Sequence, residues 1–228
     1  MTDMTGLSPQ PNPSDLTLEE IRAALAPALA RHAAFDGWRK DALDMAAGEI
    51  GVDPDVAALA FAGGAMEMID AWFASIDARM LIALPPEALA RMKIRERISA
   101  LVEARLSLLA RDREALRRAL AVMALPANIL RAGKLGWRAA DIIWRAAGDV
   151  ATDYNHYSKR ATLAAVYAAT LLAFVDDESE DHVDTRAFLA RRIDGIMRFE
   201  KAKARLTGAG GERLSLSRFI GRLRYPVV

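Results

Sequence analysis

The sequence predicts an all-α protein: a bundle of about nine helices followed by one short amphipathic helix. Apolar residues recur every three or four positions through most of the chain, the period of a helix that buries one side. No run of β-branched residues alternates with polar ones, so no strand is expected. Hydrophobic residues make up 53% of the 228, enough for one packed core. The expected helices cover residues 18–32, 36–50, 53–61, 64–84, 86–110, 112–125, 126–148, 152–175, 185–206 and 212–225.

The first three expected helices are short and joined by tight turns. Residues 1–16 contain several prolines and are expected to be a disordered lead. Short polar side chains then stand where N-caps are needed, and Gly51 ends the second helix. The expected N-caps are Ser14, Asp15 or Thr17 for the first helix, Asp36 for the second, and Asp53, followed by Pro54, for the third.

Prolines and capping residues also divide the rest of the expected domain, residues 17–207. Apolar residues at helical spacing run along 64–84, and the Pro85-Pro86 pair ends that helix and begins the next. Residues 208–211, Gly-Ala-Gly-Gly, are expected to be a flexible hinge before 212–228, the amphipathic helix and tail. The later helices are expected to begin at Asp112, at Pro126, at Thr152 or Asp153, and at Thr185.

The charge of the chain is divided unevenly. Residues 1–183 carry 20 Lys and Arg against 26 Asp and Glu, whereas residues 184–228 carry 11 against 4. This asymmetry indicates an anionic partner for the C-terminal part. Cysteine is absent, which removes disulfides, thiolate metal sites and thiol nucleophiles and fits a reducing compartment.

The layout of the first three helices resembles the DNA-binding end of TetR-type regulators, so a ligand-sensing transcriptional regulator is one candidate function. The charges argue against it. Residues 36–55 hold six acidic side chains and only Arg39 and Lys40 as bases. Because DNA affinity comes largely from neutralising phosphates, this surface is expected to repel a duplex, and no nucleic-acid partner is expected.

The most distinctive passage, residues 141–172, crowds aromatic and polar residues around one turn between two helices. Gly148 suits a left-handed C-terminal position and Thr152 or Asp153 the next N-cap, so a purely structural role explains part of it. Aromatic residues beside a polar turn are also typical of an interface. The candidate partner-binding residues are Trp144, Asp149, Asp153, Tyr154, Asn155 and Tyr157.

At these residues the chain resembles the ubiquinone-biosynthesis proteins of the ninth Coq family. The resemblance runs from about residue 36 to residue 193 and is strongest in the block AGDVATDYNHYSKRA. Further matches are Asp141-x-x-Trp144 and the segments 63–67, 93–97, 124–128 and 184–193. The chain departs from the family pattern at Arg145 and Ala146, where an aromatic residue is expected, and at His156, where tryptophan is common.

The resemblance implies a TetR-like fold that no longer binds DNA, usually as a homodimer. It implies a hydrophobic cavity for an isoprenoid lipid or ubiquinone precursor. It also implies partnership with the demethoxyubiquinone hydroxylase through the surface near Trp144 and the following turn. The function expected from it is a non-enzymatic auxiliary protein that binds prenylated quinone precursors and presents them to that hydroxylase.

Bulky apolar side chains in the middle helices are candidates for the cavity wall. For each of them taken singly an ordinary core position is the favoured role, and only the family resemblance favours a pocket. Methionine, present at nine positions, adapts well to a flexible guest. The candidate lipid-binding residues are Phe73, Leu101, Leu108, Met123, Leu130, Trp137, Tyr167 and Leu171.

The expected C-terminal helix has the pattern of a helix that lies on a membrane surface. Its apolar residues fall within about 100° of one another at 100° per residue, and arginines occupy the other side. The alternative is that it packs on its own domain or on a second copy. The candidate membrane-binding residues are Leu216, Phe219, Ile220 and Leu223, with Arg218, Arg222 and Arg224 on the polar side.

No catalytic constellation, metal-ligand set or cofactor motif stands out. A di-iron bundle needs two carboxylate–histidine pairs, and Asp153 with His156 supplies one. Glu67 and Asp70, on the apolar helix 64–84, are expected at a polar edge or in ion pairs. The N-terminus does not read as a secretory signal, and 161–175 is shorter than the roughly 20 residues of a spanning helix. We therefore expect a cytoplasmic protein that is peripheral on the inner membrane.

Overall fold

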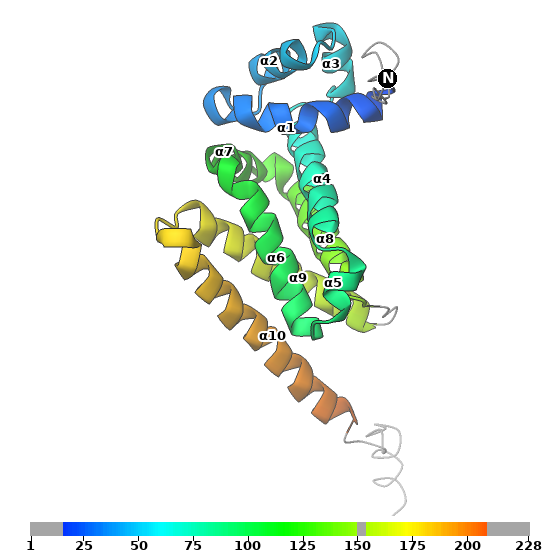
Figure 1. The fold of residues 1–228 in the computed structure, drawn as a ribbon, viewed down its shortest axis with the longest axis vertical. Helices are drawn as coiled ribbons and strands as arrows, with labels where there is room; N and C mark the ends of the chain where they lie inside the picture. Colours follow the sequence, from blue (N-terminus) through cyan, green and yellow to red (C-terminus); the bar gives the residue numbers. More distant parts are fainter. Residues whose placement is uncertain (1–15, 150–153, 209–228) are drawn as a thin grey trace, which may run out of the picture.

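The computed structural model describes residues 16–149 and 154–208, and they form helices with no strand among them (Figure 1). This confirms the all-α class. Short 3₁₀ turns lie at Ala110–Asp112, Pro126–Asn128 and Glu180–His182. The helices are α1 (Leu18–Asp36), α2 (Lys40–Ile50), α3 (Pro54–Ala60), α4 (Ala65–Ala83), α5 (Pro86–Ala90), α6 (Ile94–Leu109), α7 (Arg113–Met123), α8 (Ile129–Ala146), α9 (Tyr154–Val175) and α10 (Val183–Gly208).

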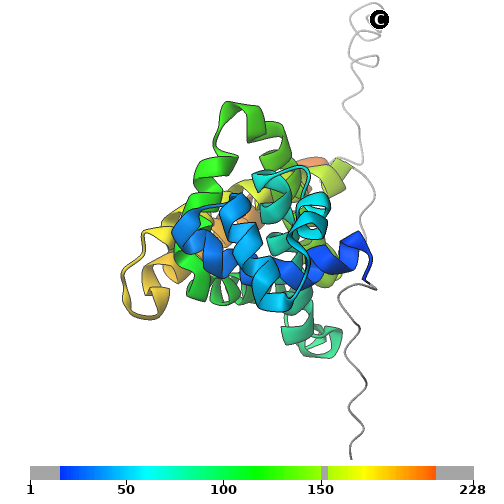
Figure 2. The same cartoon turned by 90° about the horizontal axis from the view of Figure 1, so that it is seen from above.

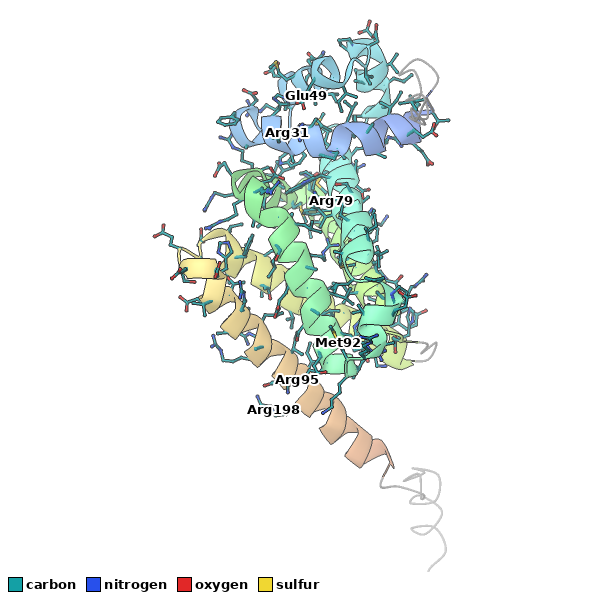
Figure 3. All side chains as sticks on the ribbon, in the orientation of Figure 1. Arg31, Glu49, Arg79, Met92, Arg95 and Arg198 are labelled. Atoms are coloured by element: carbon teal, nitrogen blue, oxygen red, sulfur yellow. The ribbon has the colours of Figure 1, made fainter. Side chains whose placement is uncertain are left out.

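Two groups of helices make up the fold. Helices α1, α2 and α3 form a trio at one end, and α4 leads from it into a bundle with α6, α7, α8 and α9 (Figure 1). Seen from above, the trio covers the end of that bundle (Figure 2). Helix α10 packs against α6 and α9 through Leu189 and Ile193, and Arg95 of α6 pairs with Asp194 at 2.8 Å. Figure 3 labels Arg95.

The trio begins as the sequence predicts and then departs from it. Thr17 and Glu20 form a capping box at the start of α1. Asp36, however, is the last residue of α1 and not the N-cap of α2, because Gly37 takes a positive φ of 74° and ends the helix there. The indole of the following Trp38 is buried and donates to the Ala115 carbonyl of α7 at 3.0 Å, which anchors the trio to the bundle.

The long helix expected over 86–110 is two helices. Helix α5 ends at Ala90, and α6 begins at Ile94. Side chains satisfy the backbone groups that the break frees: the Glu96 carboxylate accepts from the Lys93 N–H at 2.8 Å, and Arg97 donates to the Met92 carbonyl at 2.9 Å. The predicted start of α3 is confirmed, since the Asp53 side chain accepts from the Asp55 N–H at 2.8 Å.

Helix α4 forms the centre of the core, because apolar side chains cover most of its surface. Trp72 is 1% exposed and lies 5.2 Å, between ring centroids, from both Trp38 and Phe73. Helix α4 therefore contacts the trio at its start and the bundle along its length. Its buried residues are Met66, Met68, Ile69, Trp72, Phe73, Ile76, Asp77 and Met80.

The proposed segments at the two ends of the chain lie outside the described residues, apart from Leu16 of the lead 1–16 and Gly208 of the hinge 208–211. The whole of 212–228 is also outside them, so its membrane-binding residues stay predictions. Among the described helices, none is by itself long and apolar enough to cross a membrane. Helices α3 and α4 together reach that length and composition, but they meet at an 85° bend.

Candidate functional site

A hollow of about 350 Å³ lies within the bundle, between α4, α6, α7, α8 and α9. Small residues on two adjacent helices make room for it: Gly133, Gly136 and Ala139 on α8 face Ala164 and Ala168 on α9. Gly133 and Ala168 are exposed, so the pocket opens between α8 and α9. The remaining lining residues are Phe73, Arg105, Leu120, Met123, Ala132, Leu135, Tyr167 and Leu171.

Two polar side chains interrupt this apolar wall. The Arg105 Nε–H donates to the Tyr167 hydroxyl oxygen at 2.9 Å, and the Arg105 guanidinium carbon lies 5.0 Å from the centroid of the tyrosine ring. Arg105 is 1% exposed and forms an ion pair with Asp77 of α4, which is 5% exposed. The pocket therefore has one polar corner, and the one cation among its lining residues is paired with Asp77.

The ion pairs continue from this corner toward the outer face of α4. The Nε of Arg138, on α8, lies 3.7 Å from a carboxylate oxygen of Asp77, and Arg138 also pairs with Asp70. One turn earlier on α4, Glu67 pairs with Arg22 of α1 at 2.9 Å. The expectation that Glu67 and Asp70 form ion pairs is confirmed. Because acidic and basic side chains alternate along this series of ion pairs, the series brings no net charge to the pocket.

A second buried ionic cluster ties α8 to α9 at their shared turn. Arg160 is 1% exposed and donates to Asp141 at 2.5 Å and to Asp149 at 3.1 Å, and Lys159 donates to Asp149 at 2.7 Å. Burial alone would raise the pKa of Asp149, but the hydrogen bonds from Lys159 and Arg160 hold it below its usual value. We call Asp141, Asp149, Lys159 and Arg160 the turn clamp.

Gly148 forms the turn that precedes Asp149 of this clamp. Its φ of 92° lies in the left-handed region, and a Cβ there would stand 3.0 Å from an Arg97 guanidinium nitrogen. The same nitrogen donates to the Ala147 carbonyl at 2.9 Å, and the Asp149 N–H donates to the Trp144 carbonyl at 2.9 Å. Glycine is thus favoured here by the backbone conformation, and a side chain would also crowd Arg97.

Comparison with known proteins places this turn in a family. The COQ9 family model matches residues 129–200. The mitochondrial ubiquinone biosynthesis protein COQ9 of Rattus norvegicus is 30% identical over 203 residues, and the Homo sapiens protein of the same name is 30% identical over 186. The alignments cover 86% and 78% of this chain. The chain belongs to the COQ9 family.

The match does not extend over the whole of these relatives. The chain spans 64% of the length of the rat COQ9 protein and 58% of the human one. A solved structure gives the fold: a TetR transcriptional regulator from Nitrosomonas europaea superposes with a TM-score of 0.61 and is 27% identical. That comparison covers 77% of this COQ9-family chain and 97% of the regulator, and it confirms the TetR-like fold.

The family block of the COQ9-family chain surrounds the turn clamp, and two of the six expected partner-binding residues are buried there. Trp144 is 3% exposed and donates its indole N–H to the Lys159 carbonyl at 3.1 Å, and the Asp149 side chain is 6% exposed. Both residues hold α8 to α9 and do not face outward. Their motif positions reflect the geometry of the turn.

The other partner-binding candidates lie at the start of α9. Tyr157 is 62% exposed, and its ring lies 6.1 Å from that of Trp137 on α8. Tyr154 and Asn155 begin α9, and Asp153 lies outside the described residues. A contact between this area and a hydroxylase stays a prediction.

Four of the eight candidate lipid-binding residues line the pocket of the COQ9-family chain: Phe73, Met123, Tyr167 and Leu171. The other four do not. Leu101 is buried in the core, Leu108 is packed at its edge, Leu130 is 83% exposed, and Trp137 is half-buried beside Tyr157. Lipid binding by any of the eight remains a prediction.

Sequence reasoning missed the polar corner and the small residues. Arg105 follows Leu101 and precedes Leu109 at four-residue spacing, so it occupies a core-facing position on α6. A charged residue at such a position signals a buried partner, and Asp77 sits likewise among the core residues of α4. Glycines inside α8, where they cost helix stability, were the signal for missing side-chain volume.

Proposed function

We propose that this chain takes part in ubiquinone biosynthesis by holding a prenylated quinone precursor in the bundle pocket, without performing bond chemistry itself. The pocket carries the proposal, because it offers apolar surface inside a bundle whose family takes its name from that pathway. Burying apolar surface contributes about 25 cal/mol per Å², so an isoprenoid chain gains affinity without any charged contact. Among the described residues, no three His, Asp or Glu side chains gather where they could hold a metal ion.

The size of the pocket suits part of such a ligand. Ligand pockets commonly measure about 300–1,000 Å³, so about 350 Å³ has room for a ring and the first part of a prenyl tail. The rest of the tail is proposed to leave between α8 and α9. Leu130, one turn before Gly133, is 83% exposed, and Leu172, one turn after Ala168, is 59% exposed, so the path outward stays apolar.

We further propose that the basic C-terminal part brings the pocket to a membrane. Described residues of α10 already present exposed cations, namely Arg186, Arg191, Arg192 and Arg198. Each arginine near an anionic leaflet contributes about 1 kcal/mol, and the apolar side of 212–225 would insert beside them. In this proposal the protein is a homodimer on the cytoplasmic face of the inner membrane and presents its lipid to the demethoxyubiquinone hydroxylase.

The direct test is the lipid that co-purifies with the full chain. We expect mass spectrometry of its organic extract to give a prenylated ring lipid. In Gly133→Phe the lipid should be lost, because Gly133 lines the pocket and a Cβ there meets no atom within 4 Å. Gly48→Phe is the matched control, since it also adds a side chain at an exposed helical glycine with free space, but on α2. Equal lipid in both variants would refute the pocket.

The second candidate is a transcriptional regulator that senses an apolar ligand, and the likeness to the Nitrosomonas europaea regulator favours it. The surface of α2 and α3 opposes it. Lys40 is held by Asp44 at 2.7 Å, and Asp41, Glu49, Asp53 and Asp55 are exposed. Since phosphate neutralisation dominates DNA affinity, we expect no retardation of genomic DNA fragments at low salt. A specific shift would favour the regulator.

A further inference from the structure

We infer that the bundle pocket selects a neutral ligand that carries a hydrogen-bond acceptor oxygen, such as a quinone carbonyl, and that the Tyr167 hydroxyl recognises it. The inference rests on the proposed function and names what distinguishes its ligand from other apolar molecules. Both a pure hydrocarbon and an anionic lipid are disfavoured at this site.

The first step concerns the proton of the Tyr167 hydroxyl. Tyr167 is 3% exposed and lines the pocket. Its oxygen accepts from the Arg105 Nε–H at 2.9 Å, and arginine has no acceptor to offer in return. Within the described part of the chain the hydroxyl proton meets no acceptor. A buried donor without a partner costs free energy, so this corner favours a guest that brings an acceptor oxygen.

The second step excludes a hydrocarbon as the preferred guest. An alkane or alkene tail that filled the corner would keep water out and leave the Tyr167 proton unpaired. A quinone carbonyl placed there receives that proton. A net hydrogen bond of ordinary strength, about 1 kcal/mol, corresponds to about a fivefold gain in affinity. The apolar wall gives both guests the same hydrophobic contribution, so the oxygen decides between them.

The third step excludes an anionic head group. Arg105 is the one cation among the lining residues, and it pairs with Asp77, which does not line the hollow. Arg138 and Asp70 extend the pairing without adding net charge. A phosphate in the corner would meet a cation that is already neutralised, while losing its own hydration. Burying such an unpaired charge is costly, so a neutral oxygen is the better match.

The test compares three probes that share a tail: 2-decyl-1,4-benzoquinone, decylbenzene and decyl phosphate. Their affinities for the full chain are measured by displacement of the neutral dye N-phenyl-1-naphthylamine. We expect the quinone to bind about fivefold more tightly than decylbenzene, and decyl phosphate to bind most weakly. Tyr167→Phe should bring the first ratio close to one by weakening the quinone. Tyr157→Phe, an exposed tyrosine on the same helix and outside the pocket, should leave the ratio unchanged.

Each alternative outcome is distinct. Equal binding of quinone and decylbenzene by the native chain would overturn the inference and leave the lipid pocket standing, and this comparison needs no variant. A ratio unaltered in Tyr167→Phe would overturn the role of the hydroxyl, and tightest binding of decyl phosphate would overturn the charge argument. Binding of none of the probes would refute the proposed function together with this inference.

Discussion

The bundle holds two buried ionic clusters that use the same chemistry in different ways. At the turn clamp, Arg160 serves two carboxylates, Asp141 and Asp149, and Lys159 completes the second. At the pocket corner, Arg105 serves one carboxylate and the Tyr167 hydroxyl, and both Arg105 and Tyr167 line a hollow. The clamp is internally satisfied, whereas the corner keeps one donor unused. Buried charge alone therefore does not mark a binding site; in our proposal, the remaining donor beside the pocket does.

The largest expected effect separates the clamp from the surface. Arg160→Met removes the one buried cation that pairs with both Asp141 and Asp149, and we expect a loss of about 3–5 kcal/mol in the free energy of unfolding. Urea titration measures it. Arg145→Met is the control: Arg145 is exposed and pairs with the same Asp141 at 2.9 Å, so its removal should cost less than about 1 kcal/mol. Similar costs for both variants would mean that the clamp contributes no more than a surface pair.

The next effect is the pH dependence of the clamp. Because the folded pKa of Asp149 is lowered, its contribution is complete above the unfolded pKa of about 3.9 and is lost as pH falls through the folded value. Asp149→Asn should lower the free energy of unfolding by about 3 kcal/mol at pH 7. This is at the lower end of the range for a broken buried ion pair, because Arg160 still pairs with Asp141. Thermal unfolding should show the two proteins converging below about pH 4. A gap that stays constant with pH would contradict the ionic role.

A smaller effect tests whether the pocket and the basic C-terminal part act separately. Phe219→Ser with Leu223→Ser removes two apolar side chains worth ~1.5–3 kcal/mol each on full insertion. We expect sedimentation with anionic liposomes to fall more than about tenfold, while the co-purifying lipid and the fold remain. Gly133→Phe should do the reverse. Unchanged sedimentation of the double variant would refute the membrane role of this segment.

Much of the fold was readable from the sequence because its signals are local. The Thr17 capping box, Asp53-Pro54 and Pro86 each act on the next few residues, and each begins a helix where predicted. Asp36 was misassigned because Gly37, one residue later, controls that boundary. The break between α5 and α6 was missed because Lys93, the N-cap of α6, is not a residue type that favours an N-cap, although Glu96 accepts from its N–H as in a capping box.

The candidate site was only partly predictable, since it depends on which helix faces meet. Tyr167 and Leu171 were candidates because of their bulk and the family resemblance, and they do line the pocket. The partner of Tyr167, Arg105, lies 62 residues away on another helix, and only the packing brings them together. Trp144 was predicted as a partner contact from its motif, whereas its indole is buried and donates to the Lys159 carbonyl of α9.

The most direct test of the central claim is photocrosslinking with a prenylated benzoquinone that carries a diazirine in its tail. Peptide mapping by mass spectrometry should place the label on residues 132–139 of α8 and 164–171 of α9, and excess 2-decyl-1,4-benzoquinone should compete it away. The label should disappear in Gly133→Phe and persist in Gly48→Phe. Label confined to α1–α3 or α10, or insensitive to Gly133→Phe, would contradict a lipid pocket in the bundle.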